Sequence, residues 1–334
     1  MRIVIAGAGA IGGYIGARLA RAGADVVLFA RGPHLQAMRE RGLRVLSPEG
    51  DFDVRPEVTG DLHTVGPADV VILGVKAHSL PAIAPSLGPL FGADTVVVTT
   101  QNGIPWWYFQ GIGGALDGLR LERVDPGGVI AASIEPRRVV GSLSYFSTDI
   151  AEPGVIHHTE GNRLSVGEPD GTRSERSRRI AEALTAAGFH CPITTRIRDE
   201  IWVKLLGNIA FNPISALTGG TLEEMARHPD VARLAREVMG ETAAVAGKLG
   251  IELPISIDRR MAGAARVGAH KTSMLQDLEA GRPMELEAIV GAVVELGERL
   301  EVAMPATRAI YACAKLLDEH RTQRAHPHTE EAVR

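Results

Sequence analysis

Cysteine is scarce in this chain of 334 residues, and its scarcity excludes two kinds of architecture. Only Cys191 and Cys313 are present, so the chain has neither a disulfide framework nor a thiolate metal cluster. The adjacent His157 and His158 would point to opposite faces of a strand, and we expect no metal site. Such sparing use of cysteine fits a reducing compartment, so we expect a cytoplasmic protein.

Two further absences limit the partners. The formal net charge is −4 at pH 7, which supplies no positive surface for a polyanion, so we expect no nucleic acid partner. No apolar run reaches the length needed to cross a bilayer, so we expect no membrane partner. With 45% hydrophobic and 23% charged residues, the composition is that of a folded globular protein.

The N-terminal part of the chain alternates strand-like and helical patterns. Apolar runs at Arg2 to Ala6 and Asp25 to Ala30 flank a helical pattern from Gly12 to Ala22, and further runs lie at Asp69 to Val75 and Thr95 to Thr100. This alternation predicts a parallel, doubly wound sheet of the Rossmann type. The predicted domain covers residues 1–196 and also includes β-rich segments from Val129 to Val166, a helix near Ser174 to Ala187 and a strand near Cys191 to Thr195.

The second half of the chain has a different pattern. From about Arg198 onward, β-branched runs give way to long Ala, Leu, Glu and Arg patterns. We therefore predict an all-α C-terminal domain over residues 197–320, followed by a polar, frayed tail over residues 321–334.

A glycine-rich loop follows the first predicted strand and opens the first predicted helix. The pattern G-x-G-x-x-G consists of Gly7, Ala8, Gly9, Ala10, Ile11 and Gly12. In this context the first glycine permits a tight turn, the second lets the backbone approach a pyrophosphate, and the third allows close packing of helix and sheet. The helix N-terminus adds amide donors for phosphate, so we predict a dinucleotide site here.

The residue that follows the second strand favours NADP over NAD. Where an NAD enzyme usually carries an acid for the ribose hydroxyl, this chain has Arg31, whose guanidinium can bind a 2′-phosphate. Lys76, just past another strand, is expected at the same edge of the sheet as a second positive charge. Either residue could instead be an ordinary solvated side chain.

The segment from Ile201 to Pro213 is apolar except for Lys204, Asn208 and Asn212. Their spacing of four aligns them along one side of a helix that is otherwise apolar nearly all round. Buried lysine and asparagine need partners, which a polar substrate would provide. Alternatively, Lys204 extends its ammonium to water while its stem packs. Pro213 predicts that the helix kinks or ends near Asn212.

Taken with the glycine loop, three further motifs resemble the ketopantoate reductase family. They are the W-x-K-L-x-x-N-x-x-x-N-P pattern from Trp202 to Pro213, the triplet Gln101-Asn102-Gly103 after a strand, and Ser273-Met274-Leu275-Gln276-Asp277 followed by Glu285. The resemblance implies a Rossmann-like domain joined to a helical domain like the C-terminal domain of 6-phosphogluconate dehydrogenase. It also implies NADPH-dependent reduction of 2-dehydropantoate to pantoate in pantothenate biosynthesis. Because dimers are common among similar proteins, a homodimer is the assembly that it suggests.

The resemblance also implies a role for each matching residue. Lys204 is the general acid and Glu285 completes the catalytic site. Asn102 lies near nicotinamide and substrate, Asn208 and Asn212 bind the keto acid, and Ser273 contacts its carboxylate. An ammonium at hydrogen-bond distance can stabilise the charge that develops on a ketone oxygen during hydride transfer and then donate a proton. Alternatively, Asn102 is turn chemistry, Ser273 a helix cap and Glu285 a solvated helix residue.

Two segments depart from the family pattern. Thr218-Gly219-Gly220-Thr221 occupies the place where pantoate-making members commonly carry another substrate-binding asparagine, which either threonine could replace. Trp106 to Phe109 hold four of the fourteen aromatic residues. They could line a larger substrate pocket or a lid, or pack against the helical domain or a second subunit.

These departures leave alternative functions open. One is the reduction of a bulkier 2-keto acid, or a reaction of a hydroxy acid dehydrogenase from the wider 6-phosphogluconate dehydrogenase-like group. A function of another class is a non-catalytic protein that binds NADPH as a sensor.

Overall fold

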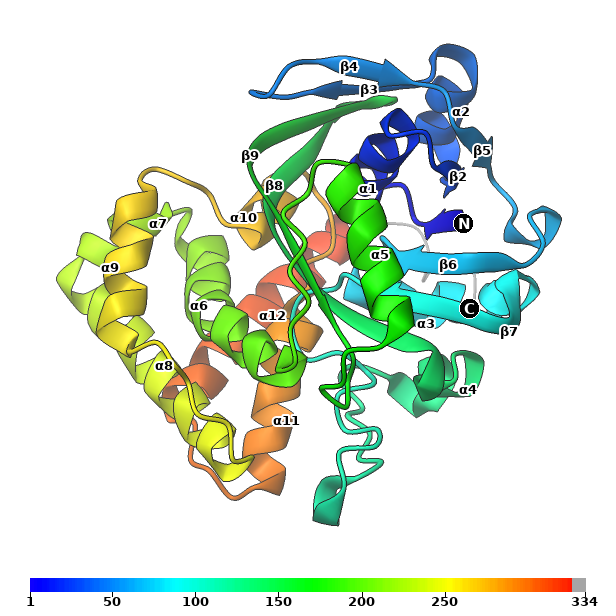
Figure 1. The fold of residues 1–334 in the computed structure, drawn as a ribbon. Helices are drawn as coiled ribbons and strands as arrows, with labels where there is room; N and C mark the ends of the chain where they lie inside the picture. The colour runs from blue at the N-terminus through cyan, green and yellow to red at the C-terminus, as the bar shows by residue number, and fades with distance from the viewer. Residues whose placement is uncertain (326–334) are drawn as a thin grey trace, which may run out of the picture. The chain divides into compact units, whose positions relative to one another are not determined.

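The computed structural model describes residues 1–325, and these form two compact units (Figure 1). The first unit consists of Met1–Gln101 and Pro105–Arg198, and the second of Asn102–Ile104 and the chain from Asp199 onward. The short segment Asn102–Ile104 thus belongs to the helical unit although its sequence neighbours belong to the first unit, which the sequence does not predict.

The first unit is built on a nine-stranded sheet within the described part of the chain, in the order β4-β3-β9-β8-β7-β6-β1-β2-β5. The strands are β1 Arg2–Ala6, β2 Asp25–Phe29, β3 Leu43–Leu46, β4 Phe52–Val54, β5 Glu57–Thr59, β6 Ala68–Leu73, β7 Phe91–Thr99, β8 Val139–Glu152 and β9 Val155–Gly167. From β5 through β2, β1, β6 and β7 to β8, neighbouring strands are parallel. This part has the strand order of a Rossmann fold, as predicted, with its topological switch between β1 and β6.

Beyond this parallel part, which confirms the prediction, the β-rich segment adds antiparallel strands and makes the whole sheet mixed. Strand β9 pairs antiparallel with β8, and β3 and β4 pair antiparallel with each other beside it. The long β8–β9 pair forms because only Pro153 and Gly154 separate the two strands, and Gly154 has a φ of 85° that suits a tight turn. A connection this short can join only antiparallel strands.

Helices cover the sheet of the first unit. They are α1 Ala10–Arg21, α2 Gly32–Arg41, α3 Leu80–Ile83, α4 Val129–Ser133 and α5 Glu175–Ala186. The apolar sides of α1 and α5 pack on strands β1, β3, β8 and β9 to form the main core (Figure 1). Ser174 caps α5 by accepting a hydrogen bond from the Ser177 amide. The predicted strand near Cys191 to Thr195 is reduced to isolated bridges at His190 and Ile193.

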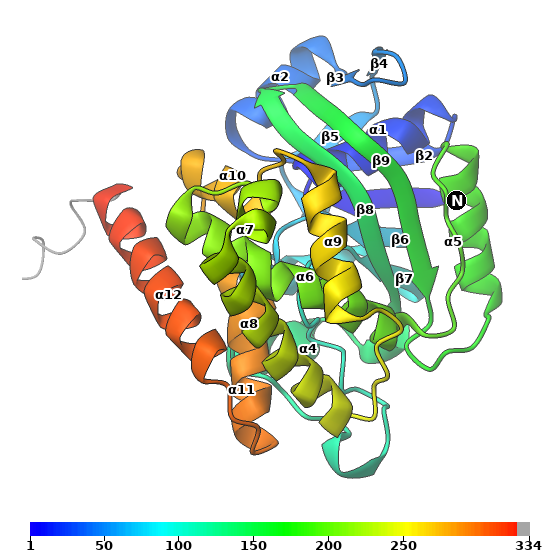
Figure 2. The same ribbon diagram turned by 90° about the vertical axis from the view of Figure 1, so that its left-hand side faces the viewer.

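The second unit is helical, as predicted (Figure 2). Its helices are α6 Ile197–Thr218, which begins two residues before the unit does, α7 Leu222–Arg227, α8 Pro229–Lys248, α9 Ile257–Val267, α10 Ser273–Glu279, a π-helical turn Glu287–Gly291, α11 Ala292–Arg299 and α12 Pro305–Ala325. Among these, α6 carries many fully buried apolar side chains.

Two predictions about helix ends in this unit need correction. Helix α6 does not end near Asn212 but continues past Pro213 to Thr218, because Ile214, Ser215 and Ala216 are buried and their packing outweighs the hydrogen bond that proline removes. A kink at this position, the other outcome predicted, stays a prediction. Helix α12 continues through Ala325, so residues 321–325 are helical rather than part of a tail. The rest of the predicted tail lies outside the described residues. No helix within residues 1–325 combines the length and apolarity needed to cross a bilayer.

Candidate functional site

The glycine-rich loop connects β1 to α1 at the topological switch of the sheet. Gly7 has a φ of 110°, and a Cβ built there would lie 2.4 Å from Val75 Cγ1. A Cβ on Gly12 would lie 2.1 Å from the Gly7 carbonyl oxygen and 3.0 Å from Gly74, so α1 packs on the sheet only without a side chain there. A Cβ on Gly9 would meet nothing within 4 Å. The loop thus leaves open space at the glycine where a pyrophosphate would approach.

Polar groups gather near the ends of the neighbouring strands. Gln101 Nε2 donates to the carbonyl oxygens of Leu73 and Val75 at 2.8 and 2.7 Å, which fixes the amide plane. Its Oε1 is buried without a hydrogen-bond partner in the described structure. Lys76 is half-buried directly after Val75. A buried acceptor without a partner is costly, so this edge of the sheet is suited to a ligand that donates a hydrogen bond.

Arg31 follows β2 and occupies the N-cap position of α2. It is exposed, and its guanidinium carbon lies 5.3 Å from the centre of the Phe29 ring. Stacking on the ring restricts the guanidinium while leaving its donors accessible, as phosphate recognition requires.

In the helical unit, Lys204, Asn208 and Asn212 lie at successive turns of α6. Asn212 is buried, whereas Lys204 and Asn208 are partly buried. Burial lowers the pKa of Lys204 from 10.5 to about 8, while the Glu285 carboxylate opposes this shift and the Arg260 guanidinium adds to it. Lys204 is therefore mainly protonated at neutral pH yet is a much better proton donor than an exposed lysine.

Glu285 joins Lys204 and Asn102 into one polar group. Its side chain is 8% exposed, and its Oε2 accepts a hydrogen bond from Asn102 Nδ2 at 3.2 Å. Because it is buried, the interpretation as a solvated helix residue is wrong. This bond also orients the amide of Asn102, whose Oδ1 lies on the opposite side of the amide group and can accept a hydrogen bond.

A π-helical turn supports this arrangement. Directly after Glu285 and Leu286, residues Glu287–Gly291 form the wide turn, and the Ala288 carbonyl accepts a hydrogen bond from the Ile104 amide at 3.0 Å. Gly103 has a φ of 85°, and a Cβ there would lie 2.1 Å from the Ala288 carbonyl oxygen. The triplet that contains Asn102 is therefore fixed to the π-helical turn by close backbone contact, and π turns are frequent at functional sites.

Ser273 is exposed, unlike the other predicted substrate residues. It is exposed at the first position of α10, and the hydroxyl of Thr272 caps that helix by accepting from the Leu275 amide. The cap is thus Thr272, so the interpretation of Ser273 as a cap is wrong, and its predicted contact with the substrate stays a prediction.

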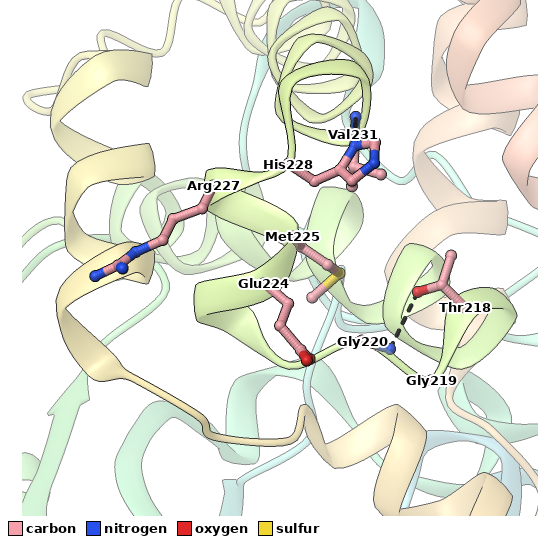
Figure 3. Close-up of a pocket in the computed structure, with 8 residues that line it drawn as sticks. All are labelled: Thr218, Gly219, Gly220, Glu224, Met225, Arg227, His228 and Val231. Carbon is pink, nitrogen blue, oxygen red and sulfur yellow. Dashed lines mark hydrogen bonds between the residues drawn. The ribbon is translucent and has the colours of Figure 1, made fainter.

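The two threonines that depart from the family pattern make local hydrogen bonds. Thr218 Oγ1 accepts a hydrogen bond from the Gly220 amide (Figure 3) and donates one to the Ile214 carbonyl. Thr221 forms a reciprocal cap with Glu224 at the start of α7. Beside them lies an open hollow of about 610 Å³. Its lining residues are Thr218, Gly219, Gly220, Glu224, Met225, Arg227, His228 and Val231. Apart from Thr218, which could replace the missing asparagine, none of these belongs to the predicted site residues, and this lining holds no buried lysine comparable to Lys204.

The aromatic cluster Trp106–Phe109 is buried inside the first unit. Trp107 Nε1 donates to Thr99 Oγ1 at 3.1 Å, and the ring packs on Gly141, where a Cβ would lie 2.9 Å away. Arg198 donates to the carbonyl oxygens of Tyr108 and Gln110. These contacts give the cluster a packing role within its own unit.

Sequence reasoning missed Arg260, since its position on α9 is distant in sequence from every recognised motif. Sequence reasoning also did not predict that Gln101 Oε1 is a buried acceptor without a hydrogen-bond partner in the described structure. In residues 1–325, no group of three or more His, Cys, Asp and Glu side chains is arranged to hold a metal ion.

The contact between Gly103 and Ala288 predicts the outcome of a matched pair of substitutions. Gly103→Ala and Gly111→Ala both place a side chain at positive φ, but a Cβ on Gly111 meets nothing within 4 Å. The backbone conformation should lower the free energy of unfolding of both variants by about 1–2 kcal/mol. The clash with Ala288 should lower that of Gly103→Ala by about 1–3 kcal/mol more. Urea unfolding measures both. Equal losses would show that the packing on Ala288 is not a constraint.

Comparisons with known proteins agree with this geometry. The ketopantoate reductase PanE/ApbA family model matches residues 3–171, and its C-terminal counterpart matches residues 196–318. A 2-dehydropantoate 2-reductase of Mesorhizobium japonicum is 49% identical over 319 residues, covering 95% of this chain and 98% of that protein.

Solved structures are similar over nearly the whole chain. A candidate ketopantoate reductase from Ralstonia solanacearum MolK2 is 39% identical with a TM-score of 0.92, covering 96% of this chain and 98% of that one. A 2-dehydropantoate 2-reductase from Methylococcus capsulatus is 31% identical with a TM-score of 0.81, with the same coverage. With a Rossmann-like unit, a helical unit and family matches across both, the chain belongs to the ketopantoate reductase family.

Proposed function

We propose that this protein reduces 2-dehydropantoate to pantoate with NADPH. The observation that carries the proposal is the group formed by Lys204, Glu285 and Asn102 in the helical unit, in which a lysine of lowered pKa stands beside a buried carboxylate. Family membership supports the reaction, and the relative from Mesorhizobium japonicum carries that activity in its name.

The nucleotide loop fits a dinucleotide. The open space at Gly9 and the close packing at Gly12 match the roles of these glycines in a pyrophosphate loop. The buried, unpartnered Oε1 of Gln101 supplies an acceptor for a ribose hydroxyl. Arg31, with Lys76 as a second charge, would bind the 2′-phosphate and favour NADPH over NADH. When bound, the nicotinamide supplies hydride to the ketone carbon.

The residues of the helical unit supply the proton and the polar contacts. As the ketone carbon accepts hydride, its oxygen gains negative charge, which the Lys204 ammonium stabilises and then neutralises by donating a proton. Glu285 favours the protonated form of Lys204 and orients Asn102. Asn208 and Asn212 would donate amide hydrogen bonds to the keto acid, and Ser273 would contact its carboxylate.

The packing of Trp107 on Thr99 and Gly141 within the first unit supports 2-dehydropantoate over a bulkier keto acid. The proposal includes a place in pantothenate biosynthesis, a cytoplasmic location consistent with two free cysteines, and a homodimeric state.

Replacing Lys204 tests the reaction and the proton donor together. NADPH oxidation at 340 nm should proceed with 2-dehydropantoate, and Lys204→Ala should lower kcat by about 10²- to 10⁴-fold, as expected for loss of a general acid. Lys248→Ala, at an exposed position of α8, is the control and should retain wild-type rates.

The outcomes separate the alternatives. If the protein reduces only a bulkier 2-keto acid, the proposed substrate is wrong but the proposed catalytic residues stand. NADPH binding without turnover of any keto acid would favour a sensor, and an unchanged rate in Lys204→Ala would remove this residue from the mechanism.

The pH profile follows from the sign of the pKa shift. Because the protonated form of Lys204 is active in reduction, kcat/KM should be level near neutral pH and fall tenfold per pH unit above about 8. Glu285→Gln removes a charge that raises the pKa, so the break should move to lower pH. A profile that stays level to about pH 10 would contradict a lowered pKa.

Cofactor choice should depend on Arg31. Arg31→Asp should raise the Kd for NADPH by about ten- to a hundredfold through loss of charge-assisted hydrogen bonds to the 2′-phosphate, and should leave NADH binding unchanged or stronger. Arg39→Asp, exposed on the same helix, is the charge-matched control. Fluorescence titration with both cofactors measures this, and an equal effect on NADPH and NADH would exclude phosphate recognition by Arg31.

A further inference from the structure

The guanidinium of Arg260 lies against helix α6 at Gly207. A Cβ built on Gly207 would lie 2.2 Å from Nη2, 2.3 Å from Nε and 2.6 Å from the guanidinium carbon of Arg260. Glycine in a helix interior is unfavourable, and here its lack of a side chain makes room for the guanidinium. Arg260 itself belongs to α9 and is partly buried.

This position brings Arg260 next to the proposed proton donor. Gly207 follows Lys204 by three residues, so the two positions are neighbours on one face of α6. The electrostatic effect of Arg260 on Lys204 agrees with this placement. Asn208, the next residue along α6, belongs to the same stretch of helix.

The charges of this group favour an anion. The groups that act electrostatically on Lys204 are the Glu285 carboxylate and the Arg260 guanidinium, so a second cation stands near the Lys204 ammonium in addition to the carboxylate. Two cations held close together repel each other, and a bound anion relieves that repulsion. The ligand chemistry that fits is a small molecule with a carboxylate beside the group on which Lys204 acts.

We propose, relying on the function proposed above, that Arg260 binds the carboxylate of the 2-keto acid substrate. In such an acid the carboxylate carbon is bonded directly to the ketone carbon, so a guanidinium one helical turn from Lys204 can hold the carboxylate while the ammonium meets the ketone oxygen. The planar fork of arginine matches the two carboxylate oxygens, which lysine at this position would not do. Arg260 thus selects 2-keto acids over neutral ketones and orients the ketone.

The test compares an acid with a neutral counterpart. The substrates are 2-dehydropantoate and its lactone, in which the carboxylate is closed into an uncharged ester while the ketone is retained. Arg260→Gln should raise KM for the acid by about ten- to a hundredfold, corresponding to loss of a charge-assisted pair. Its kcat/KM for the lactone should stay within about threefold of wild type. Arg260→Lys, which keeps the charge, should recover part of the preference for the acid.

Two further variants separate binding from a structural role. Gly207→Ala keeps both charges, but the added methyl group displaces the Arg260 guanidinium, which is the mobile end of its side chain. Like Arg260→Gln, this variant should therefore show a smaller preference for the acid over the lactone. Arg259→Gln removes an exposed charge from the same helix and should leave the preference unchanged. Calorimetric titration with pantoate gives a readout independent of turnover and should show weaker binding in Arg260→Gln.

The results distinguish this inference from the proposed function. Suppose that wild type reduces 2-dehydropantoate, but Arg260→Gln keeps the wild-type ratio of kcat/KM for the acid to kcat/KM for the lactone, whether or not both values fall. Arg260 then does not bind the carboxylate, and the proposed function stands. If wild type reduces no 2-keto acid, the proposed function fails and the inference fails with it.

Discussion

The site depends on keeping the ammonium of Lys204 largely surrounded by protein. Burial disfavours its charged form, the Arg260 guanidinium adds to this effect, and the Glu285 carboxylate opposes it. The balance leaves a pKa of about 8, at which the side chain is still protonated in neutral solution but gives up its proton readily. An apolar helix provides the burial, and a buried carboxylate from a distant part of the chain limits the cost of the charge.

Glu285 is held in place by backbone geometry as much as by charge. In the π-helical turn that follows it, the Ala288 carbonyl accepts a hydrogen bond from the Ile104 amide. Gly103, which has no side chain, permits this close approach of the two backbones. This contact holds Asn102 next to Glu285, although the two are 183 positions apart in the chain. A loop that follows β7 thus belongs to the helical unit and delivers a polar side chain to it.

The sequence predicts those features that local chemistry determines. The glycine loop is predictable because the roles of Gly7 and Gly12 follow from covalent geometry, and the polar stripe on α6 is predictable because helical periodicity aligns it. Features that arise from long-range packing were not predictable: the antiparallel β8–β9 addition, the π-helical turn and the placement of Arg260 over Gly207. Helix α6 does not end near Pro213, as one of the two predicted outcomes required, because burial of the following residues outweighs the local effect of proline. The sequence leaves the role of Thr218 and Thr221 open, and in the structure Thr218 bonds back to the Ile214 carbonyl while Thr221 caps α7.

The most direct measurement of the central claim is the titration of Lys204 itself. The chain has only five lysines, at positions 76, 204, 248, 271 and 315, so ¹³C-lysine labelling gives a simple NMR spectrum. The signal of Lys204 is assigned as the one absent from a Lys204→Arg variant. The account predicts that this signal titrates near pH 8; a midpoint near the ordinary lysine value of about 10.4 would contradict it.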